Sequence, residues 1–405
     1  MKILLVNTLY PPHDVGGAER SVALLASGLA RAGAAVSVLT LADGPATVDE
    51  VVDGIVVRRL PLKNLYWPYG GDRPGPFMRA LWHGMEVVGG GMDAALARAV
   101  RDLQPDIIHA HVMTGFGQSV FRAVGRQRLP LVITLRDYSL MCARASMFRS
   151  SRRCQSRCHD CALLTWGKAT ASMRTDHVVS ISKALLQTHR DHGLFRDTPC
   201  TVIGNAAASA RIVRRPSLAD QPEITFGFLG RVEPAKGVEV LLEATRRMHG
   251  LWRLRIGGRG DPAYVEGLRR RFDDPRLTWL GQTDSSDFYR DVDVVVAPAL
   301  WAEPFGRVVV EAAAHGRAVI ASRIGGLPEA AACARLAVLV EAGDADALAL
   351  AMQDAILNPV QWRFGAERPR EPVWTEAAIA EAHMALYRQM LAASASRIPA
   401  DRSQR

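Results

Sequence analysis

The feature that most constrains the fold is an alternation of strand-like and helix-like segments, which runs through the chain twice. In the first half, apolar runs at residues 2–6, 35–41, 54–60, 106–110 and 130–135 alternate with helix-like segments at 18–32, 92–103 and 118–127, and residues 177–181 begin another such unit. This alternation predicts a parallel sheet covered by helices on both faces, with ligands bound beyond the carboxyl ends of the strands.

The alternation restarts at residue 224, after a polar stretch at 208–222 that we interpret as a linker. Strand-like runs at 224–230, 251–256, 277–280, 292–297 and 318–322 surround helix-like segments at 238–248, 264–272, 286–291 and 308–314. A last helix is expected at 375–390, and the tail from residue 392 is expected to fray. Because 405 residues exceed one ordinary core, we expect two domains of roughly 200 residues each.

Composition limits the class and the compartment. Apolar residues make up 48% of the chain and charged residues 22%, as in soluble globular proteins. The sequence contains no run of 18 apolar residues, so we do not expect a membrane-spanning helix. The apolar run at the N-terminus is too short for a secretory signal, so we expect a cytoplasmic protein with reduced thiols.

The formal net charge is +9. Nucleic-acid binding is not indicated, because no helix-turn-helix, zinc finger or aromatic stacking platform accompanies the charge. A basic face that meets an anionic acceptor or the inner face of a membrane fits better, which predicts peripheral membrane association. An arginine-rich composition inherited from the genome is the other interpretation, and the sequence does not decide between the two.

Two glutamates, Glu303 and Glu311, frame a segment that follows a strand-like run and opens an apolar helix. We expect Glu303 at the mouth of the helix and Glu311 about two turns into it. The backbone N–H groups of Phe305 and Gly306 at the helix N-terminus favour an anion. Carboxylates beside an anion site indicate bound hydroxyl groups, so the segment predicts a nucleotide-sugar site.

Two cations, Arg231 and Lys236, lie between a strand-like run that ends at Gly230 and a helix that begins near residue 237. The field of a helix disfavours cations at its N-terminal end, so this placement costs stability unless an anion binds there. Arginine can bind two phosphate oxygens in a fork and lysine acts as a point charge, so the turn predicts a diphosphate cradle.

These motifs carry a resemblance to a known family. Gly230-Arg231-x4-Lys236-Gly237, Glu303-x7-Glu311 and the segment at 324–329 resemble the donor-binding domain of retaining GT-B glycosyltransferases of the family-4 type. The resemblance implies an α/β fold of two Rossmann-like domains facing across a cleft. It implies an acceptor-binding domain at 1–207, a donor-binding domain at 208–372, a C-terminal helix at 373–391 that packs back on the first domain, and a tail at 392–405.

The implied reaction moves a hexosyl unit, with retention, from a nucleoside-diphosphate sugar to a saccharide or lipid-linked acceptor, in cell-envelope or exopolysaccharide biosynthesis. No Asp-x-Asp motif stands in a suitable position, so we expect catalysis without a divalent ion or other cofactor. A sugar-nucleotide epimerase with the same architecture and a non-catalytic sugar-nucleotide-binding protein are the alternatives.

The resemblance also implies roles for single residues. Glu303 would contact sugar hydroxyls and Glu311 the nucleotide ribose, and the Gly258 turn would line the base pocket. The predicted catalytic residues are Arg231, Lys236, Glu303 and His111; the predicted substrate-binding residues are Gly16, Gly17, Asp137, Gly230, Gly258, Arg259, Phe305, Gly306 and Glu311.

In the first half, alternate residues of a strand face one side, so His109 and His111 are expected to point the same way. A His-x-His pair suggests a metal, but no third ligand lies at metal spacing. By the resemblance, His111 lies near the transferred sugar and His109 supports it. Arg136 stands where the family commonly has His, and Asp137 either binds an acceptor hydroxyl or pairs with Arg136.

Four of the six cysteines lie within a basic insertion at about 142–161: Cys142, Cys154, Cys158 and Cys161. In a reducing compartment such spacing predicts a structural metal site, with zinc before an iron–sulfur cluster. Free thiols or a disulfide in a loop is the alternative.

Overall fold

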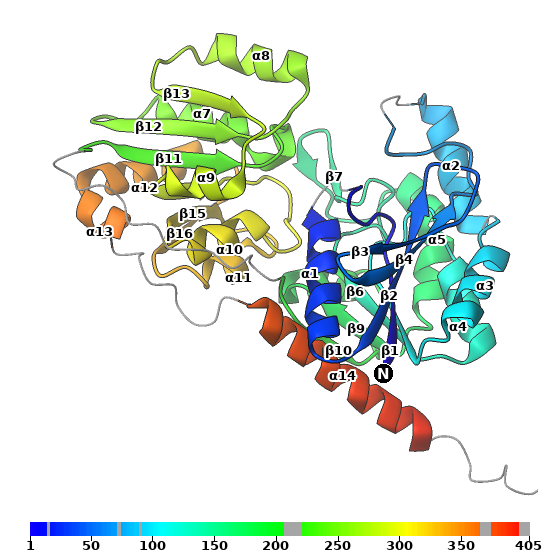
Figure 1. The fold of residues 1–405 in the computed structure, drawn as a ribbon. Coiled ribbons are helices and arrows are strands. Elements are labelled where there is room, and N and C mark those ends of the chain that lie inside the picture. Colours follow the sequence, from blue (N-terminus) through cyan, green and yellow to red (C-terminus); the bar gives the residue numbers. More distant parts are fainter. Residues whose placement is uncertain (14–16, 71–73, 89–90, 206–220, 365–373, 397–405) are drawn as a thin grey trace, which may run out of the picture. The chain divides into compact units, whose positions relative to one another are not determined.

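The computed structural model describes residues 1–13, 17–70, 74–88, 91–205, 221–364 and 374–396. The chain divides into two compact units. Unit 1 comprises Met1–Ser146, Gln155–Ala206 and Glu376–Arg405, and unit 2 comprises Met147–Cys154 and Ala207–Thr375. Each unit is a sheet covered by helices (Figure 1).

The sheet of unit 1 has the strand order β10-β9-β6-β5-β1-β2-β4-β3, and all neighbouring strands run parallel except the β3–β4 pair. Its strands are β1 (Lys2–Val6), β2 (Ala35–Ala42), β3 (Val48–Val52), β4 (Ile55–Pro61), β5 (Ile107–Ala110), β6 (Leu131–Leu135), β9 (His177–Ser180) and β10 (Cys200–Val202). The connections reverse direction between β1 and β5, so a crevice is expected where these two strands end.

The helices of unit 1 are α1 (Gly17–Arg31), α2 (Pro76–Val88), α3 (Asp93–Leu103), α4 (Ser119–Gln127), α5 (His159–Ser172), α6 (Lys183–Asp191) and α14 (Glu376–Ser396). The C-terminal helix α14 packs against α1 (Figure 1). Gly28 allows this close approach, because a Cβ there would lie 3.0 Å from the Cβ of Ala380, and Arg31 pairs with Glu376 beside it. The predicted return of the last helix to the first domain is confirmed.

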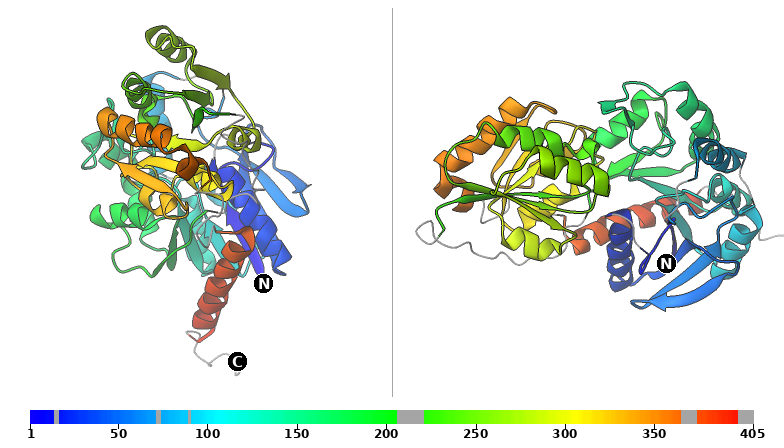
Figure 2. Two further views of the ribbon diagram at one scale, coloured as in Figure 1. Left: turned by 90° about the vertical axis from the view of Figure 1, so that its left-hand side faces the viewer. Right: turned by 90° about the horizontal axis from the view of Figure 1, so that it is seen from above.

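Unit 2 contains a wholly parallel six-stranded sheet with the order β13-β12-β11-β14-β15-β16. Its strands are β11 (Ile224–Leu229), β12 (Trp252–Gly257), β13 (Leu277–Gly281), β14 (Val294–Ala297), β15 (Ala318–Ser322) and β16 (Ala337–Val340). The unit also includes a separate small hairpin of β7 (Phe148–Arg149) and β8 (Arg152–Arg153). Its helices are η1 (Pro234–Lys236), α7 (Val238–Thr245), α8 (Pro262–Arg271), α9 (Ser285–Arg290), α10 (Arg307–Ala314), α11 (Leu327–Ala331), α12 (Ala345–Leu357) and α13 (Pro359–Phe364). Helices lie on both faces of the sheet (Figure 2).

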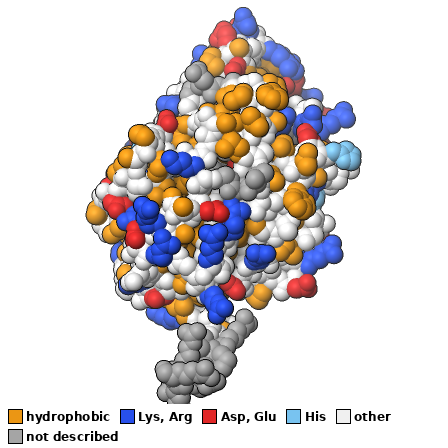
Figure 3. Space-filling model, turned by 90° about the vertical axis from the view of Figure 1, so that its right-hand side faces the viewer, with side chains coloured by type: hydrophobic (Ala, Val, Ile, Leu, Met, Phe, Trp, Pro, Cys, Tyr) orange, Lys and Arg blue, Asp and Glu red, His pale blue; other side chains and the backbone are white. Residues whose placement is uncertain are grey.

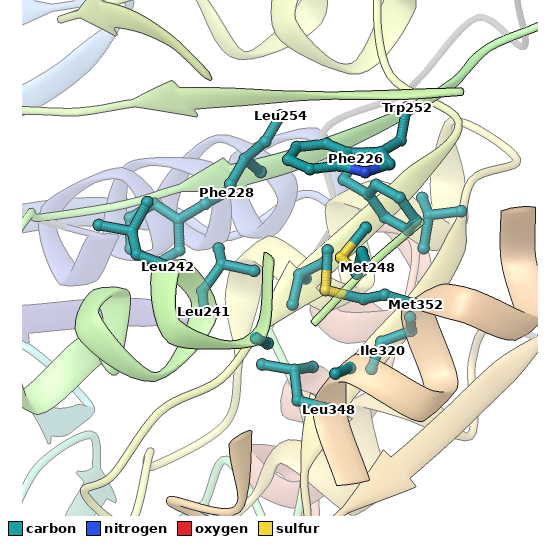
Figure 4. Packing of buried hydrophobic residues seen from close by; sticks show 14 of the residues in the cluster. Phe226, Phe228, Leu241, Leu242, Met248, Trp252, Leu254, Ile320, Leu348 and Met352 are labelled. Carbon is teal, nitrogen blue, oxygen red and sulfur yellow. The ribbon is translucent and has the colours of Figure 1, made fainter. Parts of the chain in front are cut away.

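The core of unit 2 is an apolar layer between the sheet and helices α7 and α12. Phe226 and Phe228 of β11 meet Leu241 of α7 and Met352 of α12, and Trp252 closes one end of the cluster (Figure 4). All five side chains are almost completely buried. This packing holds the central strand β11 firmly, and the loop after β11 carries the cations predicted to bind diphosphate.

The structure adds elements that the sequence patterns did not predict. β3 pairs with β4 through the turn at Asp53 and Gly54, where both residues have positive φ; Asp-Gly between two strands is a hairpin signal that the strand-helix alternation hides. Helix α5 starts inside the segment expected to be a basic loop, and α14 continues to Ser396, five residues past the predicted end. Within the described part of the chain, no helix combines the length and apolar character needed to cross a membrane.

Candidate functional site

The predicted donor residues gather at one edge of unit 2. In its sheet the connections reverse between β11 and β14, because β11 leads through α7 to β12 on one side and β14 leads through α10 to β15 on the other. Ligands of open parallel sheets bind beyond the carboxyl ends of the strands at such a reversal. The Arg231–Lys236 turn follows β11 and the Glu303–Gly306 loop follows β14, so the topology brings the two motifs together.

The turn after β11 touches the loop after β14 through backbone atoms. The N–H groups of Leu300 and Trp301 donate to the carbonyl of Ala235, at 2.9 and 3.3 Å. Gly237 has φ +71°, and a Cβ on it would lie 1.8 Å from the carbonyl oxygen of Pro298. Only glycine fits this position, so the Gly that ends the predicted motif is fixed by packing as well as by backbone conformation.

The central contact of the site is an ion pair. Lys236 Nζ lies 2.5 Å from Glu303 Oε1, and the two side chains are 20% and 15% exposed. The same ammonium lies 5.0 Å from the centroid of the Trp301 ring, which favours a cation above its face. A predicted phosphate-binding cation and a predicted sugar-binding carboxylate are therefore adjacent, 67 residues apart in sequence. Sequence reasoning predicted both residues but not their direct pairing.

Arg231 is placed differently from Lys236. Its side chain is 68% exposed and its Nη2 lies 3.1 Å from Glu233 Oε1. An exposed arginine in a flexible pairing can turn toward a phosphate at little cost, because a surface ion pair contributes only about 0–1 kcal/mol. Its role in binding phosphate stays a prediction.

The loop after β14 leads directly into helix α10. Gly306 precedes the helix with φ +98°, and Phe305 is buried. The loop after β15 packs on the same backbone: the N–H of Gly326 donates to the carbonyl of Glu303 at 2.7 Å, and a Cβ on Gly325 would lie 2.4 Å from that oxygen. Two glycines from a distant motif thus support the segment that presents Glu303.

Glu311 is the fifth residue of α10, a little more than one turn into the helix, so the predicted depth of two turns is wrong. The helix begins at Arg307 because the Gly306 backbone conformation sets its start. Arg307 Nε donates to Glu311 Oε1 at 2.6 Å and the hydroxyl of Tyr289 donates to Glu311 Oε2 at 3.0 Å. Both contacts orient the carboxylate, and burial beside it raises the pKa of Tyr289 well above its usual value.

A third loop, after β12, completes this edge of the sheet. Gly258 has φ +132° and a Cβ on it would lie 1.7 Å from the carbonyl oxygen of Gly230, so the two glycine turns touch backbone to backbone. The N–H of Val232 donates to the carbonyl of Arg259 at 2.7 Å, while the Arg259 side chain is exposed. The loops after β11, β12, β14 and β15 thus form one connected edge.

In unit 1 the two predicted histidines lie at the carboxyl end of β5: His109 is in the strand and His111 directly follows it. Their rings point the same way, with centroids 4.1 Å apart. His109 is buried and both its nitrogens have partners: Nδ1 lies 2.5 Å from the Tyr387 hydroxyl and Nε2 lies 2.6 Å from Oγ1 of Thr134. This arrangement matches the supporting role predicted for His109.

His111 differs from His109 because one of its nitrogens has no partner within the described residues. Arg136 Nε donates to His111 Nδ1 at 3.3 Å, and the buried Nε2 makes no hydrogen bond there. Burial, and then the charges of His109 and Arg136, lower the pKa of His111 well below its usual value. The ring is therefore neutral with its proton on Nε2, because Nδ1 accepts from Arg136.

A buried group of polar residues in unit 1 was not predicted. Glu86 is buried and paired with Lys168 at 2.6 Å, and it accepts the N–H of Gly115 at 2.6 Å. Burial raises the pKa of Tyr69, as do the charges of Glu19 and Asp137. Nothing in the local sequence marks this cluster, because its members come from separate loops and helices.

Two other predicted acceptor residues can be placed in part. Asp137 accepts the backbone N–H of Ser139 at 2.8 Å, and burial raises the pKa of its carboxyl. Gly17 is the first residue of α1, and its carbonyl accepts the Ser21 hydroxyl at 2.8 Å. Gly16 lies outside the described residues.

Three of the four predicted metal ligands lie together in unit 1. Sγ of Cys161 lies 3.9 Å from Sγ of Cys142, and the ligand atoms of Cys158, Asp160 and Cys161 lie within 4.8 Å of one another. Burial raises the pKa of Cys161 to about 12. Among the described residues, neither Cys142 nor Cys154 belongs to that group of three ligand atoms, and Cys142 is linked to it through Cys161. Asp160 was not among the predicted ligands.

Two family models match the chain. The model described as glycosyl transferase 4-like domain matches residues 16–206, and the model described as glycosyl transferases group 1 matches residues 223–358. A protein of Klebsiella pneumoniae, described as an uncharacterized 42.6 kDa protein in the cps region, is 29% identical over 329 residues, which cover 81% of this chain and 87% of that protein.

Solved structures are similar over nearly the whole chain. Sucrose-phosphate synthase from Thermosynechococcus elongatus has a TM-score of 0.74 at 22% identity, and the match covers 97% of this chain and 99% of that chain. Anabaena HepE in complex with UDP-glucose has a TM-score of 0.63 at 20% identity, and the match covers 98% of this chain and 100% of that chain. At these identities the likeness shows the fold, which is GT-B.

Proposed function

Because the chain belongs to the group 1 glycosyltransferases, a family of enzymes that use nucleotide sugars, we propose that it transfers a hexosyl unit from a nucleoside-diphosphate sugar to a saccharide or lipid-linked acceptor, with retention at the anomeric carbon. The observation that carries the proposal is the pair of Lys236 and Glu303 at the strand reversal of unit 2. A cation for the diphosphate and an acid for the sugar hydroxyls stand side by side. We take residues 208–372 as the donor domain and 1–207 as the acceptor domain.

Catalysis rests on fixed positive charge around the leaving group. Negative charge grows on the departing diphosphate, and Lys236, Arg231 and the N-terminus of α10 stabilise that charge in place of a divalent ion. Glu303 balances Lys236 before the donor binds and holds the sugar hydroxyls afterwards. The leaving phosphate helps to deprotonate the acceptor on the same face of the sugar.

Glu311 binds the ribose hydroxyls in this scheme. Its carboxylate is 12% exposed and is already oriented by Arg307 and Tyr289, so little conformational entropy is lost when the nucleotide binds. HepE, which shares the fold, was crystallised with UDP-glucose, and this supports a nucleotide-sugar donor. The turn of Gly258 and Arg259 is assigned to the nucleotide base.

On the acceptor side, His111 presents a neutral imidazole with a free Nε2–H. Such a group donates a hydrogen bond to a sugar hydroxyl and cannot act as a cation. Arg136 replaces the histidine common in the family and fixes the tautomer of His111 through Nδ1. Asp137, with a raised pKa, is assigned to an acceptor hydroxyl.

The cellular role that we propose is capsule or exopolysaccharide synthesis in the cytoplasm, at the inner face of the membrane. The relative in the cps region of Klebsiella pneumoniae supports this assignment. Unit 1 also has an apolar surface on the packed helices α2 and α5, where Phe77 is 78% exposed and Trp166 is 66% exposed. The other exposed apolar side chains of this surface are Met78, Leu81, Leu163 and Met173.

Exposed apolar side chains that gather on two packed helices indicate a binding surface. Arg79 and Arg174 are exposed on or directly after these helices. Figure 3, which faces this side of the molecule, shows apolar groups between Lys and Arg side chains. An anionic bilayer provides both a hydrophobic interior and negative head groups, so contact with a membrane suits this surface better than exposure to water.

The membrane assignment is tested with vesicles of phosphatidylglycerol and phosphatidylcholine. We expect the wild-type chain to sediment with them and the double variant Phe77→Ser, Trp166→Ser to stay in the supernatant. Leu357→Ser is the matched control, because Leu357 is 71% exposed but lies in unit 2. Equal sedimentation of the double variant and the wild type would remove the assignment.

The transfer reaction is tested at Lys236. A panel of nucleotide sugars is first screened for thermal stabilisation, which identifies a donor without knowledge of the acceptor. Lys236→Ala is then expected to reduce turnover at least about 100-fold, because it removes a charge that stabilises the leaving group. Lys63→Ala, which removes an exposed lysine of unit 1, is the control.

Wild-type turnover in folded Lys236→Ala protein would contradict the role of Lys236. Product analysis separates the reaction classes: a glycosylated acceptor supports transfer, whereas a free epimerised sugar indicates an epimerase. Tight donor binding without any product, across a broad acceptor panel, would indicate a binding protein.

A further inference from the structure

A cluster of thiols at the N-terminus of α5 belongs to unit 1, whereas the donor site belongs to unit 2, and the cluster has no part in the proposed reaction. Cys158 precedes the first residue of α5, and Asp160 and Cys161 lie in its first turn. The ligand atoms of these three residues lie within 4.8 Å of one another. A fourth group, Cys142, contributes its sulfur 3.9 Å from that of Cys161.

Local backbone structure explains why Cys142 faces the helix. The N–H groups of Met141 and Cys142 both donate to the carbonyl of Tyr138, and the N–H of Ala145 donates to the carbonyl of Cys142. The N–H of Tyr138 donates in turn to the carbonyl of Ala145, which closes the segment into a compact loop. Cys142 is buried inside this loop, and its side chain is held in place without a covalent bond.

The separation of the sulfur atoms fits a shared metal ion. Two thiolates bound to zinc at about 2.3 Å with tetrahedral angles lie about 3.8 Å apart. Cys142 and Cys161 lie 3.9 Å apart, and the Cys161 thiol also contacts that of Cys158.

Two nearby groups supply positive charge at the cluster, against the burial that raises the pKa of Cys161. The N-terminus of α5, a helix of 14 residues, carries partial positive charge that stabilises thiolates. Arg157 directly precedes the cluster. Three thiolates and a carboxylate carry a charge of about −4, which zinc, the helix end and the nearby cation offset together.

We propose that Cys142, Cys158, Asp160 and Cys161 bind one zinc ion, which fixes the loop after β6 to the start of α5. That loop begins with Arg136 and Asp137, and α5 carries Lys168, the partner of buried Glu86. The ion would therefore hold the acceptor side of unit 1 in shape without taking part in the reaction. This ligand set differs from the predicted four-cysteine set because Asp160, whose carboxylate is grouped with the thiols of Cys158 and Cys161, takes the place of Cys154, which is not in that group of described residues.

The test begins with metal content. The full chain is purified anaerobically and without an affinity tag that binds metal, and its zinc is measured by elemental analysis. We expect about one zinc ion per chain. Replacement of that ion by Co²⁺ should give the intense near-ultraviolet absorption of thiolate-to-cobalt charge transfer. Absence of metal, or iron with sulfide in its place, would overturn the proposal.

The ligand set is tested by matched variants. Asp160→Asn is expected to lower zinc affinity at least about tenfold, and Cys161→Ser to abolish zinc binding. Cys154→Ser and Cys333→Ser, which alter cysteines outside the cluster, should keep the wild-type zinc content. Loss of zinc in Cys154→Ser together with wild-type affinity in Asp160→Asn would overturn the assigned ligand set.

A measurement on the wild-type chain covers the case in which the Cys161→Ser protein does not fold. A mercurial reagent should release zinc in proportion to the thiols it blocks, and a colorimetric chelator detects the released ion. Mercurial titration without zinc release would overturn the proposal. Donor binding at Lys236 is unaffected by the outcome, because unit 2 holds that site.

Discussion

Gly237→Ala tests whether the donor site depends on the contact between its two loops. Gly237 has φ +71°, so any side chain there costs about 1–2 kcal/mol of backbone strain. The new Cβ would also lie 1.8 Å from the Pro298 carbonyl oxygen, so the loop after β14 has to move. That movement breaks the two hydrogen bonds to Ala235, each contributing about 0.5–1.5 kcal/mol.

The sum is a loss of about 2–5 kcal/mol from unit 2. For a unit of this size each kcal/mol lowers the unfolding temperature by roughly 2–4 °C. Because Lys236 and Glu303 lie on the two displaced loops, donor affinity should fall at least about tenfold as well. Calorimetry with the donor found by thermal screening measures the affinity, and thermal unfolding measures the stability.

Gly33→Ala is the control for backbone strain alone. Gly33 has φ +86°, and a Cβ there meets no atom within 4 Å. We expect a loss of about 1–2 kcal/mol from unit 1 and unchanged donor affinity. If Gly237→Ala binds donor as tightly as the wild type, the contact between the two loops does not shape the site and the reasoning fails.

Three further predictions concern other parts of the site. Glu311→Gln should raise the donor KM about 10- to 150-fold, because a hydrogen bond to a charged group contributes about 1.5–3 kcal/mol; an unchanged KM would exclude Glu311 from the ribose. Arg136→Met should release His111 Nδ1, so that 15N chemical shifts show a mixture of tautomers, whereas a single unchanged tautomer would contradict our assignment. Burial lowers the pKa values of His189 and His383 to about 4, below the pKa of histidine in the unfolded chain. Unit 1 should therefore lose stability as pH falls from about 6.5 towards 4, because the unfolded chain binds protons that the folded chain does not. His383→Gln should show a smaller fall in unfolding temperature over this pH range.

Much of the donor site could be predicted from local sequence. Arg231 and Lys236 follow β11, Glu303 follows β14 and Glu311 lies about one turn into α10, at the edge of a parallel sheet where ligand-binding residues belong. What local patterns could not show is which of them touch. The pairing of Lys236 with Glu303 depends on β11 and β14 being neighbours, although β12 and β13 lie between them in sequence.

Elements outside the main alternation were the hardest to predict. The hairpin strand β3 and helix α5 carry weak or irregular patterns, since several of their apolar residues are exposed. The depth of Glu311 in α10 was misjudged because the helix start depends on the backbone conformation of Gly306, which packs against Leu327. Such packing is invisible to a count of residues.

The amino-acid sequence by itself determined the strand-helix alternation, the parallel sheets that follow from it and the residue types at the strand ends. These properties are local, because they depend on periodicity, on turn residues and on charge near a helix end. Only the tertiary structure decided the tautomer of His111, the contact of Glu311 with Tyr289 and the approach of Cys142 to Cys161. Each depends on a contact between segments that the folded sheet, and not the order of the chain, brings together.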